Sequence, residues 1–113
     1  MGLTAQSALV NGSDLAGQIK SRLVGALGSR LRGVVAYGSR VRADARPDSD
    51  LDLLVLLNGG VQLGRDLETI IGALYPLQLT LDYPIHAVPV DGRAYDAGGY
   101  ALYRRARREG ITL

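Results

Sequence analysis

The chain has 113 residues and a net charge of +2, a size that builds one hydrophobic core and leaves little room for a second. It contains no cysteine, which excludes disulfides, thiolate metal sites and a cysteine nucleophile and suits a reducing compartment. No apolar run approaches a membrane span and no signal-peptide pattern opens the chain. We therefore expect one cytoplasmic domain over residues 1–113 with no membrane contact, loosely ordered over 1–12.

The chain begins with a predicted helix followed by a predicted strand. Ser13 or Asp14 can cap the helix, which we expect to end near Gly28. Its apolar residues recur at helical spacing: Leu15, Ile19, Leu23 and Leu27. The β-branched run at 32–37 then predicts a short buried strand.

The next segment predicts a loop and a second strand. Residues 38–49 are rich in Gly, Ser, Asp and Arg and contain Pro47, a composition typical of a loop. Residues 50–57 predict a strand that is apolar on both faces beyond Asp52. Such a strand lies centrally in a sheet or under helices.

Helical spacing returns between Leu63 and Leu74, and we expect Pro76 to limit that helix. Residues 84–90 predict a third strand, at an edge or bulged because it has proline near both ends. A last helix is predicted from about 96 to 108, with Gly110 as its stop. This order predicts an α/β (α+β) fold in which helices pack on a small mixed β-sheet.

Two acids one residue apart, Asp50 and Asp52, open the second predicted strand. Residues i and i+2 of a strand point to the same face and lie about 7 Å apart. Two such carboxylates can share a divalent cation such as Mg²⁺. Because acids are rare in strands, the pair indicates a metal site more than a stability element.

A possible phosphate-binding turn follows the first predicted strand. Gly38 and Ser39 can offer backbone N–H groups and a hydroxyl to an anion, and Arg40 and Arg42 can add charge-assisted bonds to a triphosphate. A metal clamp beside an anion cradle is what phosphoryl or nucleotidyl transfer needs. The phosphate-loop, dinucleotide-binding and serine-hydrolase patterns are absent.

These residues also resemble a known family. Tyr37-Gly38-Ser39-Arg40-Val41-Arg42 followed by Pro47-Asp48-Ser49-Asp50-Leu51-Asp52-Leu53 is similar to the signature of the minimal nucleotidyltransferases of the DNA polymerase β superfamily. Residues 103–111 resemble the closing helix of that family. One departure is Ala43, where the family usually has glycine.

The resemblance implies a polymerase β-like nucleotidyltransferase fold and a role for each matching residue. Gly38 and Ser39 would hold the terminal phosphates of ATP, with Arg40 and Arg42 beside them. Asp50 and Asp52 would bind Mg²⁺. The chain would then transfer AMP from ATP to a hydroxyl group.

The superfamily usually adds a third carboxylate from the next strand, and its position in this chain is open. His86 occupies the aligned position and could accept a proton near pH 7. Asp82 could serve instead from the preceding turn, or the alignment could be shifted. If none of them serves, the chain would bind a nucleotide without turning it over.

The resemblance also implies a partner. Similar family members act as antitoxins beside a HEPN-type RNase toxin, either by adenylylating it or by binding it. The alternative to an enzyme is thus a degenerate module that acts by contact. A homodimer would cover the edge strand. We do not expect nucleic acid as a partner, because an arginine-rich helix is more often a solvated face, although RNA or an acidic protein would fit its charge.

Overall fold

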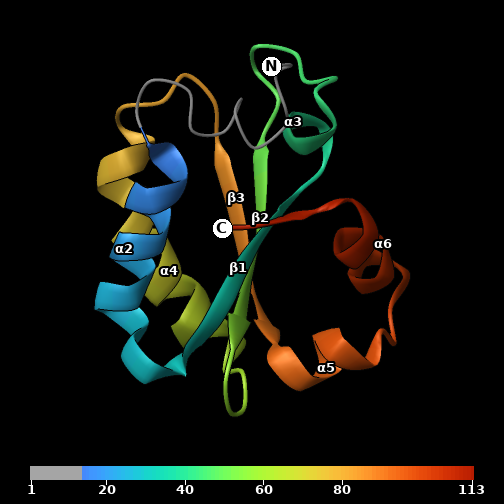
Figure 1. The fold of residues 1–113 in the computed structure, drawn as a ribbon. Helices are drawn as coiled ribbons and strands as arrows, with labels where there is room; N and C mark the ends of the chain where they lie inside the picture. The colour runs from blue at the N-terminus through green and yellow to red at the C-terminus, as the bar shows by residue number, and fades with distance from the viewer. Residues whose placement is uncertain (1–13) are drawn as a thin grey trace.

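A computed structural model describes residues 14–113, which form a four-stranded mixed sheet with helices on both faces (Figure 1). The expected loose start at 1–12 lies outside the described residues. The strand order is β3-β2-β1-β4, with β2 and β3 parallel and the other pairs antiparallel. The strands are β1 (Leu31–Tyr37), β2 (Leu51–Leu57), β3 (Ile85–Asp91) and β4 (Ile111–Thr112). The mixed α/β fold expected from the sequence is confirmed.

Helices α2 (Leu15–Leu27) and α4 (Leu63–Gln78) cover one face of the sheet (Figure 1). The larger core lies there, because alternate residues of β2 point toward these helices. Those residues are Leu51, Leu53, Val55 and Leu57. In the part of the chain that the structure describes, no helix is long and apolar enough to cross a membrane.

Helices α5 (Gly92–Ala97) and α6 (Ala101–Glu109) cover the opposite face (Figure 1). Leu54 and Leu56 of β2 point to this side and pack with Tyr95 of α5 and Ala106 of α6. Asp52 has the same parity as Leu54, so its side chain lies on this face too. The smaller helical layer leaves Asp52 partly accessible at the start of β2.

Two helices differ from the sequence-based expectation. Pro76 lies inside α4, which continues to Gln78. Proline has no N–H, so α4 loses one backbone hydrogen bond at this position. Because the helix ends only two residues later, its last turn stays helical. The prediction of one helix from about 96 to 108 is wrong at its start. Helix α5 is ended by Gly98, a left-handed cap with φ 67°, and the next helix, α6, begins at Ala101.

Two short elements were not predicted. Helix α3 (Ser39–Arg42) occupies the start of the expected loop. Strand β4 follows Gly110, whose N–H caps α6 by donating to the Ala106 carbonyl, as expected for a helix stop. β4 is only two residues long, which is too short for a sequence pattern to show.

The edge of β3 offers few free donors to an added strand. The Leu51 N–H donates to the Pro84 carbonyl, which fixes the ladder so that the N–H of every second residue from Ile85 points away from β2. The Ile85 N–H donates to the Gln78 side chain at 2.7 Å, and Pro89 has no N–H. A proline and a capped donor are devices that blunt an edge strand.

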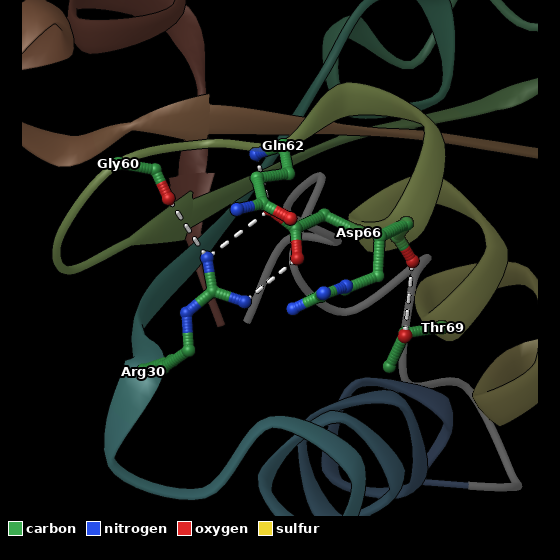
Figure 2. Close-up of polar contacts among 6 residues, drawn as sticks. Arg30, Gly60, Gln62, Asp66 and Thr69 are labelled. Atoms are coloured by element: carbon green, nitrogen blue, oxygen red, sulfur yellow. Dashed lines mark hydrogen bonds and ion pairs between the residues drawn. The ribbon is translucent and has the colours of Figure 1, made fainter.

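A buried carboxylate ties the start of β1 to α4 (Figure 2). Asp66 is only 1% exposed and accepts from both terminal nitrogens of Arg30, at 2.7 and 3.1 Å. It also accepts from the Gln62 N–H at 2.8 Å, while Arg30 donates to the Gly60 carbonyl at 3.0 Å. The bonded Arg30 guanidinium lowers the pKa of Asp66, and the Gln62 bond adds to this against the opposing effect of burial.

Candidate nucleotide site

A row of three side chains crosses the sheet where β1 ends and β2 and β3 begin. The strand register sets Tyr37 opposite Asp52 and Asp52 opposite His86. Because cross-strand partners share a face, all three side chains lie on the α5/α6 side. Asp50, two residues before Asp52, directly precedes β2.

Asp52 is the central group of this row. His86 Nδ1 lies 3.3 Å from Asp52 Oδ1. Burial raises the pKa of Asp52 above its usual range, the contact with His86 opposes that shift, and the nearby Asp50 charge adds to it. Burial and the charge of Asp52 also raise the pKa of Tyr37. Burial is the main cause of both shifts, so this end of the sheet partly shields Tyr37 and Asp52 from solvent.

Gly38 brings the backbone against Asp52. Its φ is 88°, a conformation that side chains rarely adopt. A Cβ at this position would lie 2.6 Å from Asp52 Oδ2. The Gly38 carbonyl accepts from the N–H groups of Val41 and Arg42, both at 3.1 Å, and so begins α3. Because glycine has no Cβ, the turn can pack directly against the Asp52 carboxylate.

Replacing Gly38 by alanine is expected to displace the Asp52 carboxylate and to strain the turn. We expect Gly38→Ala to lower the free energy of unfolding by about 1–3 kcal/mol and to weaken nucleotide binding. Urea unfolding and calorimetric titration with an ATP analogue measure the two effects. The control is Gly25→Ala on the exposed side of α2, where a Cβ meets nothing within 4 Å. It should stabilise the chain by about 0.5–1 kcal/mol, and equal behaviour of the two variants would contradict this role of Gly38.

The two arginines of α3 lie in different surroundings. Arg40 donates to three loop carbonyls: Ser49 at 2.7 Å, Pro47 at 2.8 Å and Arg46 at 3.3 Å. Its guanidinium also stacks on the Tyr83 ring, 3.5 Å from the centroid. Most of its donors therefore hold the loop that leads to Asp50.

Arg42 is more accessible than Arg40. It is exposed and lies 3.6 Å from Asp44 in an ion pair on the surface. Exposed pairs of this kind contribute little and exchange readily. Arg42 is thus freer than Arg40 to meet an anion near Asp52, whose pKa its charge lowers.

Ala43 ends α3 in a left-handed conformation with φ 64° and ψ 22°. Glycine adopts this conformation without strain, whereas a Cβ costs about 1–2 kcal/mol. The glycine that resembling sequences carry here therefore has a physical reason. We expect Ala43→Gly to raise the free energy of unfolding by up to about 1 kcal/mol, less the greater entropy that glycine has in the unfolded chain. A lower urea midpoint would show that the left-handed turn is not retained in solution.

The two candidate residues for the open third position lie in different surroundings. His86 faces Asp52 across β2 and β3, whereas Asp82 is exposed in the bend before β3. Within residues 14–113, no group of three metal-ligating side chains is arranged to hold an ion alone. Asp50 and Asp52 still supply the hard oxygens that suit Mg²⁺. The donor set fits a metal whose coordination is completed by nucleotide phosphates and water.

Sequence reasoning did not single out Tyr37 or Tyr83 for the site. Both are partly buried, one beside Asp52 in the row and one under Arg40. The aromatic residue directly before Gly38 was visible as part of the motif. The position of Tyr83, by contrast, depends on contacts distant in sequence.

Comparison with known proteins places this site within a family. Residues 20–92, which include the whole Tyr37–Asp52–His86 row, match the family model described as a nucleotidyltransferase domain. A crystal structure from Sulfolobus solfataricus, described as that of a candidate nucleotidyltransferase, is similar over 99% of this chain and 87% of that chain. Its TM-score is 0.63 at 18% sequence identity, so the likeness concerns the fold alone. None of the curated proteins matches the chain.

Proposed function

Because the chain belongs to the nucleotidyltransferase domain family, we propose that it is a Mg²⁺-dependent enzyme that transfers AMP from ATP to a hydroxyl group of a partner protein. The observation that carries the proposal is the approach of Gly38 to Asp52. It sets backbone donors suited to phosphate directly beside a partly buried carboxylate. An anion cradle and a carboxylate pair meet at one end of the sheet.

Each residue then has a chemical task. Gly38, Ser39 and Arg42 bind the phosphate oxygens, and Asp50 and Asp52 hold the metal. Bound Mg²⁺ would neutralise phosphate charge and lower the barrier to displacement. Arg40 positions the loop before Asp50 through its bonds to the loop carbonyls.

The transfer exchanges a phosphoanhydride bond of ATP for a phosphoester bond to the acceptor. The acceptor oxygen bonds to the α-phosphorus of ATP, the bond from that phosphorus to the bridging oxygen breaks, and pyrophosphate leaves. When His86 Nδ1 carries the hydrogen toward Asp52 Oδ1, its Nε2 has a lone pair that can take the hydroxyl proton. The side chain of His86 is 61% exposed, so an acceptor can reach it.

The class of acceptor is proposed from the resemblance of 37–42 and 47–53 to minimal nucleotidyltransferases. We propose that the acceptor is a HEPN-type toxin and that the chain acts as its antitoxin. The test incubates the protein with Mg²⁺, the product of the neighbouring gene and ATP labelled at either the α- or the γ-phosphate. Transfer of the α-label alone supports adenylylation. Transfer of the γ-label, or of neither label, overturns it.

A second function is favoured by His86, which stands where the superfamily usually has a carboxylate. The chain could then bind its partner without modifying it. The variant Asp50→Asn/Asp52→Asn separates the two functions. A complex that forms and neutralises the toxin with this variant and without ATP supports the contact mechanism. Loss of neutralisation despite an intact complex supports the enzyme.

A further inference from the structure

A concentration of positive charge lies on α6, outside the site described above. Four of its nine residues are arginine, although the whole chain has a net charge of only +2. Arg104, Arg107 and Arg108 line one hollow of the surface. Three arginines that line one hollow suit a phosphate, which arginine binds with two parallel bonds.

Two of these guanidiniums are held in place by carbonyl groups. Arg104 Nη1 donates to the Gly98 carbonyl at 2.7 Å, and Arg107 Nη1 donates to the Asp96 carbonyl at 2.8 Å. None of the three arginines that line the hollow forms an ion pair with a carboxylate in the described part of the chain. The charges of Arg104 and Arg107 are therefore positioned but not neutralised, which lowers the ordering cost of binding an anion.

An exposed aromatic residue directly precedes α6. Tyr100 is 66% exposed, and its ring meets Tyr103 edge-on with centroids 5.2 Å apart. The Arg104 N–H donates to the Tyr100 carbonyl at 3.2 Å, so Tyr100 lies one helical turn before Arg104, and residues at this spacing share one side of a helix. An exposed aromatic ring on the same side as arginines suits a site that stacks the bases of single strands.

In place of the solvated face expected from the sequence, we propose that Tyr100, Arg104, Arg107 and Arg108 form a binding site for single-stranded nucleic acid. A phosphodiester group lies in the hollow, and an unpaired base stacks on Tyr100. An acidic protein surface would satisfy the arginines but gives no planar base for the ring, so the combination favours a nucleic acid. The inference does not depend on the proposed transfer reaction, because it involves neither ATP nor Asp52.

The test is fluorescence anisotropy with a labelled oligouridylate 12-mer, in EDTA and without ATP. We expect saturable binding whose affinity falls with salt at a log–log slope of about −0.7, for the one phosphate in the hollow. Arg108 has no hydrogen bond that holds the fold, and we expect Arg108→Gln to weaken binding by about fivefold. Tyr100→Ala should weaken it by about tenfold, whereas Tyr100→Phe keeps the ring and should stay within about twofold.

The matched control is Arg65→Gln on α4, which removes one exposed positive charge from the opposite side of the sheet. It should leave binding within about twofold. Equal losses in Arg65→Gln and Arg108→Gln, no effect of Tyr100→Ala, or tighter binding of an oligoglutamate peptide would each overturn the proposal. The Asp52→Asn variant should bind the oligonucleotide like the wild type. A failure of the proposed nucleic-acid site can therefore be distinguished from a failure of the proposed transfer reaction.

Discussion

Asp52→Asn is expected to reduce nucleotidyl transfer by at least about 100-fold while leaving the fold intact. In the proposed reaction this carboxylate would hold the metal that neutralises phosphate charge, a contribution of several kcal/mol to the transition state. Its loss should lower kcat more than it raises KM for ATP, because the metal acts most strongly as charge develops. The rate at which labelled AMP is transferred to the acceptor measures the change.

The same substitution should not destabilise the chain. Because burial raises the folded-state pKa of Asp52, its charge at neutral pH opposes folding, and a neutral side chain removes that cost. We expect the urea midpoint of Asp52→Asn to equal or exceed that of the wild type. Asp48→Asn in the exposed loop is the control and should change neither activity nor stability. Lost activity with a lower midpoint would assign Asp52 a structural role instead.

Asp66→Asn, in contrast to Asp52→Asn, is expected to destabilise the folded chain. Asp66 accepts three hydrogen bonds from Arg30 and Gln62 while almost fully buried. An amide presents a donor where a carboxylate oxygen accepts, so at least one donor loses its partner. We expect the free energy of unfolding at pH 7 to fall by about 2 kcal/mol. Glu68→Gln, an exposed acid on the same helix, should change it by less than about 0.5 kcal/mol.

The contribution of the Asp66 charge to the free energy of unfolding should depend on pH. Its folded-state pKa is lowered, chiefly by Arg30. The charged form therefore stabilises the folded chain above the unfolded pKa of about 4, and this stability is lost as pH falls through the folded pKa. The difference between the wild type and Asp66→Asn should narrow below about pH 4. A difference that stays constant from pH 7 to pH 3 would contradict the lowered pKa.

The sequence predicted the elements whose signal is local. Leucines at helical spacing marked α2, and the runs at 32–37 and 50–57 marked the two central strands. The Asp50 and Asp52 pair could be placed on one face because a strand has a period of two. The turn at Gly38 could be set beside the pair because it ends the strand that precedes theirs, and the family resemblance then gave the two a common reaction.

Contacts between distant residues lay beyond the sequence pattern. Arg30 and Asp66 are 36 positions apart, and nothing in either neighbourhood indicates their pairing. Arg40 looked like a phosphate ligand, yet most of its donors bind loop carbonyls. The glycines that separate α5 from α6 were visible, but only the left-handed backbone at Gly98 ends the helix there. Such outcomes depend on which tertiary contacts form.

The most direct test of a metal-nucleotide site at Gly38 and Asp52 is calorimetric titration with Mg²⁺ and an ATP analogue whose α,β-bridge resists cleavage. The wild type should bind one analogue per chain. EDTA or the Asp50→Asn/Asp52→Asn variant should weaken that binding by at least about tenfold. Equal binding by the variant, or no saturable binding by the wild type, would contradict the assignment of this sheet end as the site of nucleotidyl transfer.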